Sequence, residues 1–263
     1  MRPDSIALDD THIFSKVPPV TLAFWIVKIF ATTVGETGGD ALSMTLKLGY
    51  VVSSLIFLVF FLVTLLAQVK SKHYHPVFYW LVVVATTTVG TTTSDMLDRT
   101  FALGYIKSSA IELALVVVVL VAWHFSTGSI GVDRIVTRKN EIFYWVTILV
   151  SNTLGTALGD FMATDAGLGF EKGALVFAAL LALVAAFHFF TNVPESILFW
   201  SAYVLTRPLG ATLGDTLTKP VADGGLNFGR ITSSLAIAAG MILIVATTSL
   251  RKRASEPPVP VGT

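Results

Sequence analysis

Four aspartates recur at a fixed position in a strongly apolar chain, and their spacing is the first sign of chemistry. Each lies five residues after a glycine and fifteen residues after a tryptophan. The four sets are Trp25–Gly35–Asp40, Trp80–Gly90–Asp95, Trp145–Gly155–Asp160 and Trp200–Gly210–Asp215. Carboxylates that come close together in apolar surroundings must bind a cation, pair with basic groups or retain protons. The repeated aspartates therefore predict one shared acidic site.

Further oxygen-bearing side chains precede these aspartates on the same face. Positions seven, eleven and fifteen residues after a tryptophan are four apart, so they share one side of a helix. The predicted ion-binding residues are Asp40, Asp95, Asp160, Asp215, Glu36, Thr91, Asn152 and Thr156, with the four aspartates as metal ligands. Oxygen ligands of this kind favour Mg²⁺, Mn²⁺ or Ca²⁺ over copper or zinc.

Two basic residues interrupt the polar stripe. Lys28 lies three residues after Trp25, and Arg207 takes the place in the fourth copy that Thr32 takes in the first. We expect both to compensate the carboxylates when no cation is bound. If the two cations dominate, the same stripe favours an anion.

The spacing of the tryptophans predicts how the chain is built. They are 55, 65 and 55 residues apart, which indicates a unit duplicated once and then duplicated again as a pair. The chain is 54% hydrophobic and only 13% charged, and a bilayer core needs roughly 20 apolar residues per helix. We predict an all-α integral membrane fold of four parallel two-helix repeats, with helices near residues 21–40, 50–69, 77–95, 105–125, 141–160, 171–190, 195–214 and 228–249.

Small residues distinguish the first helix of each repeat. Ten and fourteen residues after each tryptophan stand Gly35 and Gly39, Gly90 and Ser94, Gly155 and Gly159, and Gly210 and Gly214. Two small residues four apart allow the backbones of neighbouring helices to approach closely. We therefore expect the first helices to form an inner bundle and the second helices to face lipid. The tryptophans themselves suit an aromatic belt at the cytoplasmic interface.

The basic residues predict the topology. Ten lie on the side of the membrane where the repeats begin and six on the other, which favours cytoplasmic termini in the inner (plasma) membrane. The predicted segments are a cytoplasmic tail (1–19), a first half with repeats one and two (20–125), a cytoplasmic connector (126–140), a second half with repeats three and four (141–250) and a disordered tail (251–263).

The Trp, Gly and Asp positions resemble a family of bacterial membrane proteins built from up to four tandem two-helix repeats, each with a characteristic tryptophan. The resemblance covers Val20 to Val245, and the fourth copy departs from it at Ala211, where the others have Thr or Glu. The family has no well-established activity, so the resemblance implies the fold and leaves the function open.

Three of the acidic residues outside the stripe also have expected roles. We expect Glu112 to pair with Lys107, and Asp98 and Asp165 to be solvated loop residues.

Three functions compete for this sequence. The first is a multi-pass transporter for a cation, which either moves a divalent metal such as Mn²⁺ or Mg²⁺ or works as a proton-coupled carrier. The cation is then the substrate, and no cofactor is expected. The second is a structural or sensory membrane protein whose aspartates pair with basic residues. The third is an intramembrane enzyme, which HExxH or GxSxG motifs would favour; neither occurs. We predict the transporter and no enzyme, with the bilayer and a small inorganic ion as partners. A formal net charge of +1 does not indicate a nucleic-acid-binding surface, so no nucleic-acid partner is expected. The sequence does not indicate the oligomeric state.

Overall fold

The computed structural model describes residues 16–71, 74–132, 135 and 137–255. Within these residues the chain forms eight long helices and no strand. They are α1 (Leu22–Asp40), α2 (Gly49–Lys70), α3 (Pro76–Asp95), α4 (Tyr105–Thr127), α5 (Arg138–Asp160), α6 (Gly169–Phe190), α7 (Glu195–Thr218) and α8 (Arg230–Ser255). Short π-helical segments continue three of them directly after the repeated aspartate: η1 (Ala41–Thr45), η2 (Met96–Thr100) and η4 (Phe161–Asp165).

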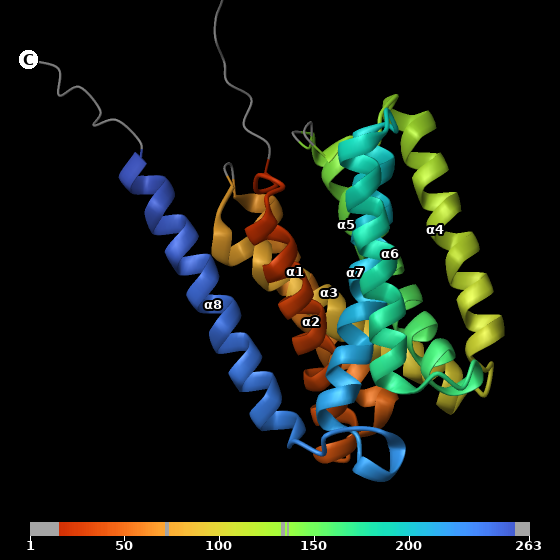
Figure 1. The fold of residues 1–263 in the computed structure, drawn as a ribbon. Helices are drawn as coiled ribbons and strands as arrows, with labels where there is room; N and C mark the ends of the chain where they lie inside the picture. Colours follow the sequence, from red (N-terminus) through yellow and green to blue (C-terminus); the bar gives the residue numbers. More distant parts are fainter. Residues whose placement is uncertain (1–15, 72–73, 133–134, 136, 256–263) are drawn as a thin grey trace, which may run out of the picture.

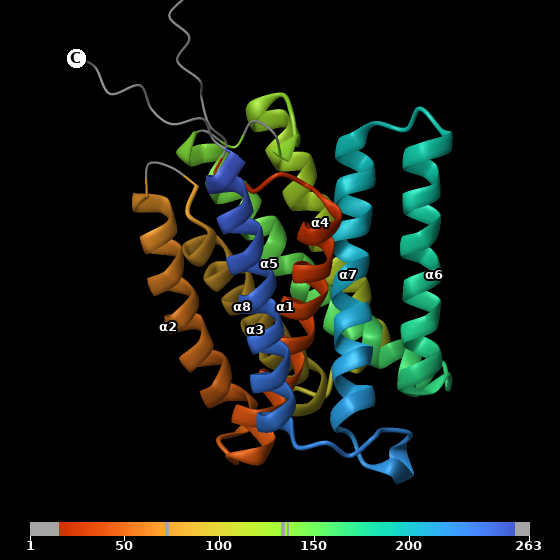
Figure 2. The same cartoon turned by 60° about the vertical axis from the view of Figure 1, so that its left-hand side comes forward.

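The first helices of the four repeats form a closed inner ring. Helix α1 packs on α3, α3 on α5, α5 on α7, and α7 on α1 again (Figure 1). Each second helix covers the inner helix of the next repeat: α2 lies on α3, α4 on α5 and α6 on α7, while α8 returns to α1 (Figure 2). Within their most apolar stretches, 72% of α3 and 67% of α5 is buried, against 11–28% of the second helices. The prediction of inner first helices and outer second helices is confirmed.

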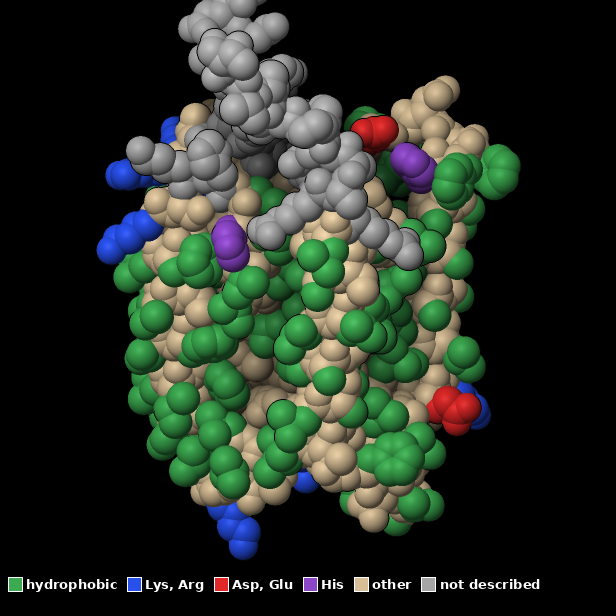
Figure 3. All heavy atoms as spheres, turned by 90° about the vertical axis from the view of Figure 1, so that its left-hand side faces the viewer, with side chains coloured by type: hydrophobic (Ala, Val, Ile, Leu, Met, Phe, Trp, Pro, Cys, Tyr) green, Lys and Arg blue, Asp and Glu red, His purple; other side chains and the backbone are tan. Residues whose placement is uncertain are grey.

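The outer surface is compatible with a multi-pass membrane protein. In the described part of the chain, α2, α3, α4, α5, α6 and α8 are long and apolar enough to cross a membrane. The candidate spans of α3 and α5 include the segments η2 and η4 that continue them. Helices α1 and α7 are the exceptions, and both carry buried charges, among them Lys28 and Arg207. Hydrophobic side chains cover the middle of the face shown in Figure 3, and basic side chains gather toward its two ends.

Glycine contacts hold the inner helices together in cyclic order. The glycine ten residues after each tryptophan lies against the residue seven after tryptophan on the adjacent inner helix. The pairs are Gly35 with Thr87, Gly90 with Asn152, Gly155 with Arg207 and Gly210 with Thr32. A Cβ atom at Gly90 would lie 2.9 Å from the backbone carbonyl carbon of Asn152. The close backbone approach predicted from the small residues is confirmed.

A ring of aromatic pairs lies at the amino-terminal ends of the inner helices. The pairs, with their ring-centroid distances, are Phe24–Trp80 (5.6 Å), Tyr79–Trp145 (5.6 Å), Tyr144–Trp200 (6.0 Å) and Phe199–Trp25 (5.7 Å). Trp80, Trp145 and Trp200 are buried, so the expectation of an interfacial belt is wrong for these three. The reason is that each tryptophan packs on the aromatic residue preceding its counterpart on the neighbouring inner helix, which buries far more aromatic surface than a lipid-facing position would.

Three helix boundaries differ from the predicted segments. Helix α4 ends at Thr127 and α5 begins at Arg138, both inside the predicted connector, and α8 runs to Ser255, five residues beyond the predicted second half. Residues 1–15 and 256–263 of the predicted tails lie outside the described residues.

Substitution of Gly90 by alanine tests the ring packing. The new methyl group would meet the backbone of Asn152 and Thr153, which cannot rotate away, so we expect Gly90→Ala to lower stability by about 1–3 kcal/mol. Gly38→Ala is the matched control, because a Cβ there meets nothing closer than the Ser234 hydroxyl at 3.9 Å. Thermal unfolding in detergent should show a lower Tm for Gly90→Ala alone. Equal Tm values for both variants would contradict the packing described.

Candidate functional site

Side chains from all four inner helices fill the interior of the ring in four layers. The layers are the positions three, seven, eleven and fifteen residues after each tryptophan. Their members are Lys28, Val83, Ile148 and Tyr203; Thr32, Thr87, Asn152 and Arg207; Glu36, Thr91, Thr156 and Ala211; and Asp40, Asp95, Asp160 and Asp215. None of them is more than 4% exposed. The structure therefore places every predicted ion-binding residue inside the ring.

The four aspartates form two pairs, and each pair shares one basic residue. Arg99 contacts Asp95 through Nε at 2.8 Å and Asp160 through Nη2 at 3.5 Å. Lys219 Nζ lies 3.2 Å from Asp40 Oδ2 and 3.2 Å from Asp215 Oδ1. The first pair joins α3 to α5, and the second joins α7 to α1.

The basic residues reduce the fourfold repeat to a twofold one. Arg99 and Lys219 both stand nineteen residues after the tryptophan of their repeat, and they are 120 residues apart. The equivalent positions in the first and third repeats hold Met44 and Thr164, which carry no charge. The two halves still differ, because Arg230 adds a third cation at 3.3 Å from Asp40.

Lys219 lies directly after the last residue of α7. Burial acts to lower the pKa of its ammonium group, but the carboxylates of Asp215 and Asp40 outweigh burial and raise the pKa above that of an ordinary lysine. Lys219 is therefore a permanent cation between two carboxylates at neutral pH.

Arg207 forms hydrogen bonds to the layer of side chains that lies between it and the aspartates. Its Nη2 donates to Glu36 Oε2 at 3.0 Å and to Thr156 Oγ1 at 2.6 Å, and also to Thr91 Oγ1. One guanidinium group thus links α7 to α1, α3 and α5. Arg207 was expected to compensate the carboxylates of the site, and the carboxylate that it contacts is that of Glu36.

Lys28 lies in the layer nearest the aromatic ring. Its Nζ donates to Asn152 Oδ1 at 3.4 Å and lies 4.2 Å from the centre of the Tyr203 ring. Asn152 in turn donates through Nδ2 to Thr86 Oγ1 at 3.0 Å. Among the ion pairs of the described residues, none joins Lys28 to a carboxylate.

One group of carboxylates has the spacing of metal ligands. Oxygens of Glu36, Asp40 and Asp215 all lie within 4.8 Å of one another, and all three residues are buried. Two of the predicted metal ligands and the predicted accessory ligand thus come together. Asp95 and Asp160 are outside this group and meet at Arg99 instead.

The basic partners of the aspartates were missed in the sequence. Arg99 and Lys219 each follow their aspartate by four residues, a spacing that brings side chains together on a helix, and this signal could have identified them. Arg230 has no such signal, because it contacts Asp40 from α8 across 190 residues of sequence.

The expectations for the outlying acids are partly wrong. Asp98 is buried, because the π-helical turn η2 carries it inward, and its carboxylate accepts a bond from Ser94 Oγ at 3.4 Å. Glu112 is also buried, yet neither of its oxygens has a hydrogen-bond partner in the described part of the chain, and Lys107 is exposed. Asp165 is exposed, as expected.

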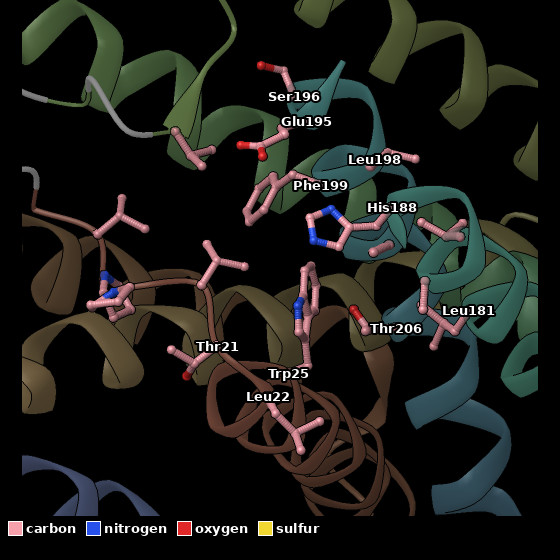
Figure 4. A pocket seen from close by; sticks show the side chains of 18 of the residues that line it. Thr21, Leu22, Trp25, Leu181, His188, Glu195, Ser196, Leu198, Phe199 and Thr206 are labelled. Atoms are coloured by element: carbon pink, nitrogen blue, oxygen red, sulfur yellow. The ribbon is translucent and has the colours of Figure 1, made fainter. Parts of the chain in front are cut away.

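A separate cavity of about 1310 Å³ opens between α1, α6 and α7. Figure 4 shows Trp25 and His188 facing each other across it, with Glu195 nearby. Its walls are mainly apolar, and none of the charged residues of the four layers lines it. The repeated charged residues therefore lie in the ring interior, and the cavity has only Tyr74, His188 and Glu195 as ionisable residues among the described residues that line it.

Comparison with known proteins agrees with the repeat architecture. The family described as Repeat of Unknown Function (DUF347) matches at residues 23–74, 78–129, 143–193 and 198–254. The searches of curated proteins and of solved structures found no match. Each matched segment covers most of one inner helix and of the outer helix that follows it. The chain therefore belongs to the DUF347 repeat family and carries four tandem copies of the repeat.

Proposed function

We propose that this protein is a cation transporter of the inner membrane, with eight transmembrane helices in a pseudo-fourfold arrangement of parallel repeats. The observation that carries the proposal is the position of Lys219. Its ammonium group lies between Asp40 and Asp215, at 3.2 Å from each, and these two carboxylates form a cluster with Glu36. The Lys219 ammonium group thus occupies the position between two carboxylates that a transported cation would take.

Charge favours a divalent substrate at this position. When Lys219 moves away, the four aspartates are opposed among the described residues by Arg99 and Arg230 alone, which leaves the layer with a formal charge of −2. One divalent cation would make the layer neutral. Carboxylate ligands with neighbouring threonine oxygens suit Mg²⁺ or Mn²⁺, and protonation of the same carboxylates offers a route to proton coupling.

Burial of so many charges is expensive and calls for a function. Replacing a buried ion pair by packed apolar side chains is often neutral or stabilising, so packing alone does not require charged layers. The second candidate, a structural or sensory membrane protein, is favoured by the basic partner that each aspartate has. The two candidates differ in what they predict for Lys219.

Both termini are proposed to lie in the cytoplasm, because of the excess of basic residues on that side. In this orientation the aspartate layer lies toward the outer face, and the aromatic pairs close the ring at the cytoplasmic end. Passage of a cation to or from the cytoplasm would then require the aromatic pairs to separate, as alternating access demands.

Neutralising the cluster should stop transport. We expect Asp40→Asn and Asp215→Asn to abolish uptake of Mn²⁺ into proteoliposomes, because each removes a carboxylate from the cluster with Glu36. Flux is measured with a metal-sensitive dye, with Mg²⁺, Ca²⁺ and protons as further substrates. Asp165→Asn is the control, since Asp165 is exposed beyond the aspartate layer. Absence of flux of any of these ions by the folded wild type would end the transporter proposal.

Substitution of Lys219 distinguishes the transporter proposal from the structural alternative. If a cation replaces Lys219, we expect Lys219→Met to bind Mn²⁺ at least about tenfold more tightly, a difference of about 1.4 kcal/mol. This should appear as a larger rise in Tm on addition of Mn²⁺ than the wild type shows. Lys172→Met, at an exposed position on α6, is the control.

The structural alternative predicts the opposite for the same variant. Asp40 would then keep only Arg230 as a partner and Asp215 would keep none, so Lys219→Met would lose about 3–5 kcal/mol of stability that Mn²⁺ does not restore.

A further inference from the structure

The two most deeply buried basic residues in the described part of the chain lie between the aspartate layer and the aromatic pairs. Lys28 on α1 and Arg207 on α7 are both 0% exposed, and they belong to adjacent helices of the ring. They are separated from the aspartates by the layer of Glu36, Thr91 and Thr156. Their surroundings therefore form a region distinct from the proposed cation cluster, with Glu36 between the two.

Arg207 uses only one of its three nitrogens. Its Nη2 makes all of its bonds, to Glu36, Thr91 and Thr156. Its Nε and Nη1 have no hydrogen-bond partner among the described residues. Leaving charged donors unpaired inside a protein costs more than leaving neutral ones, because a buried guanidinium has lost its water.

Lys28 has only neutral partners. It contacts the amide oxygen of Asn152 and the face of the Tyr203 ring. The Tyr203 hydroxyl, also buried, has no partner among the described residues. By formal charge, Lys28 and Arg207 are opposed in this region by one carboxylate, that of Glu36, so one formal positive charge has no counter-charge among the described residues.

We propose that Lys28 and Arg207 bind one small monovalent anion inside the ring. The unpaired Arg207 nitrogens and the Lys28 ammonium supply charged donors, and the uncompensated charge supplies the attraction. The ligand is small because protein encloses both side chains completely. Its chemistry is that of a halide ion or of the carboxylate group of a small organic acid. This site does not depend on the proposed cation transport.

Chloride is the probe, and the full-length protein in detergent is the sample. Equilibrium dialysis with radioactive chloride is done in EDTA, with gluconate maintaining the ionic strength, so that divalent cations play no part. We expect one chloride per chain. Competition by bromide but not by formate or acetate assigns the site to halides, and competition by formate or acetate assigns it to carboxylates; both support an anion site.

Two variants test the assigned residues. Lys28→Met should weaken chloride binding roughly tenfold or more, because it removes a charged donor. It should fold, since the charge that it removes has no carboxylate partner. Arg207→Lys keeps a cation beside Glu36 but removes the free guanidinium donors, and it should weaken binding as well. Lys172→Met, at an exposed position, should bind as the wild type does.

Thermal unfolding provides a second measurement of anion binding that is independent of dialysis. The Tm of the wild type should rise when chloride replaces gluconate, and the Tm of Lys28→Met should not. The proposal is overturned if the folded wild type binds none of chloride, bromide, formate and acetate. It is also overturned if Lys28→Met binds chloride as tightly as the wild type.

Discussion

The close contact between each inner-helix glycine and the next helix is the constraint on which the rest of the structure depends. At Gly90 the neighbouring backbone is so near that even one added carbon would lie 2.9 Å from it. Helices held this closely bring a side chain of one into hydrogen-bond reach of three others, as Arg207 shows. Wider spacing would leave the same charged residues apart and unpaired in an apolar interior, which is the costly arrangement.

Cyclic order also explains why the outer helices lie where they do. Each outer helix covers the inner helix of the following repeat, and α8 closes the circle on α1. A single repeat therefore cannot bury its own inner helix, and four copies in one chain complete the ring. The departures from fourfold symmetry are concentrated in the interior, where Lys28, Glu36 and Arg207 each replace an uncharged residue of other repeats.

Much of this could be predicted from the sequence, because regular spacing encodes one face of a helix. The polar stripe that ends at Asp40 predicted which side chains face the interior of the ring. The paired small residues Gly35 and Gly39 predicted the close contacts between helices. The spacing of residues along one helix does not show which helix lies beside which, so the contact between Arg230 and Asp40 could not be predicted. Trp80 was misplaced for a related reason: an aromatic residue suits an interface and a core equally well until its neighbour is known.

By formal charge, the described residues of the ring interior balance one another. The basic residues are Lys28, Arg99, Arg207, Lys219 and Arg230, and the acidic residues are Glu36, Asp40, Asp95, Asp160 and Asp215, five of each. The balance is not uniform, because the inner layers hold one excess positive charge and the aspartate layer one excess negative charge. Any cation that entered would upset the total, and a low-dielectric interior makes that costly. For a monovalent cation, outward movement of Lys219 or binding of an anion beside Lys28 would each restore the balance. A divalent cation adds two charges and would need both events. Under the two proposals together, the interior would therefore take up a divalent cation without a net charge.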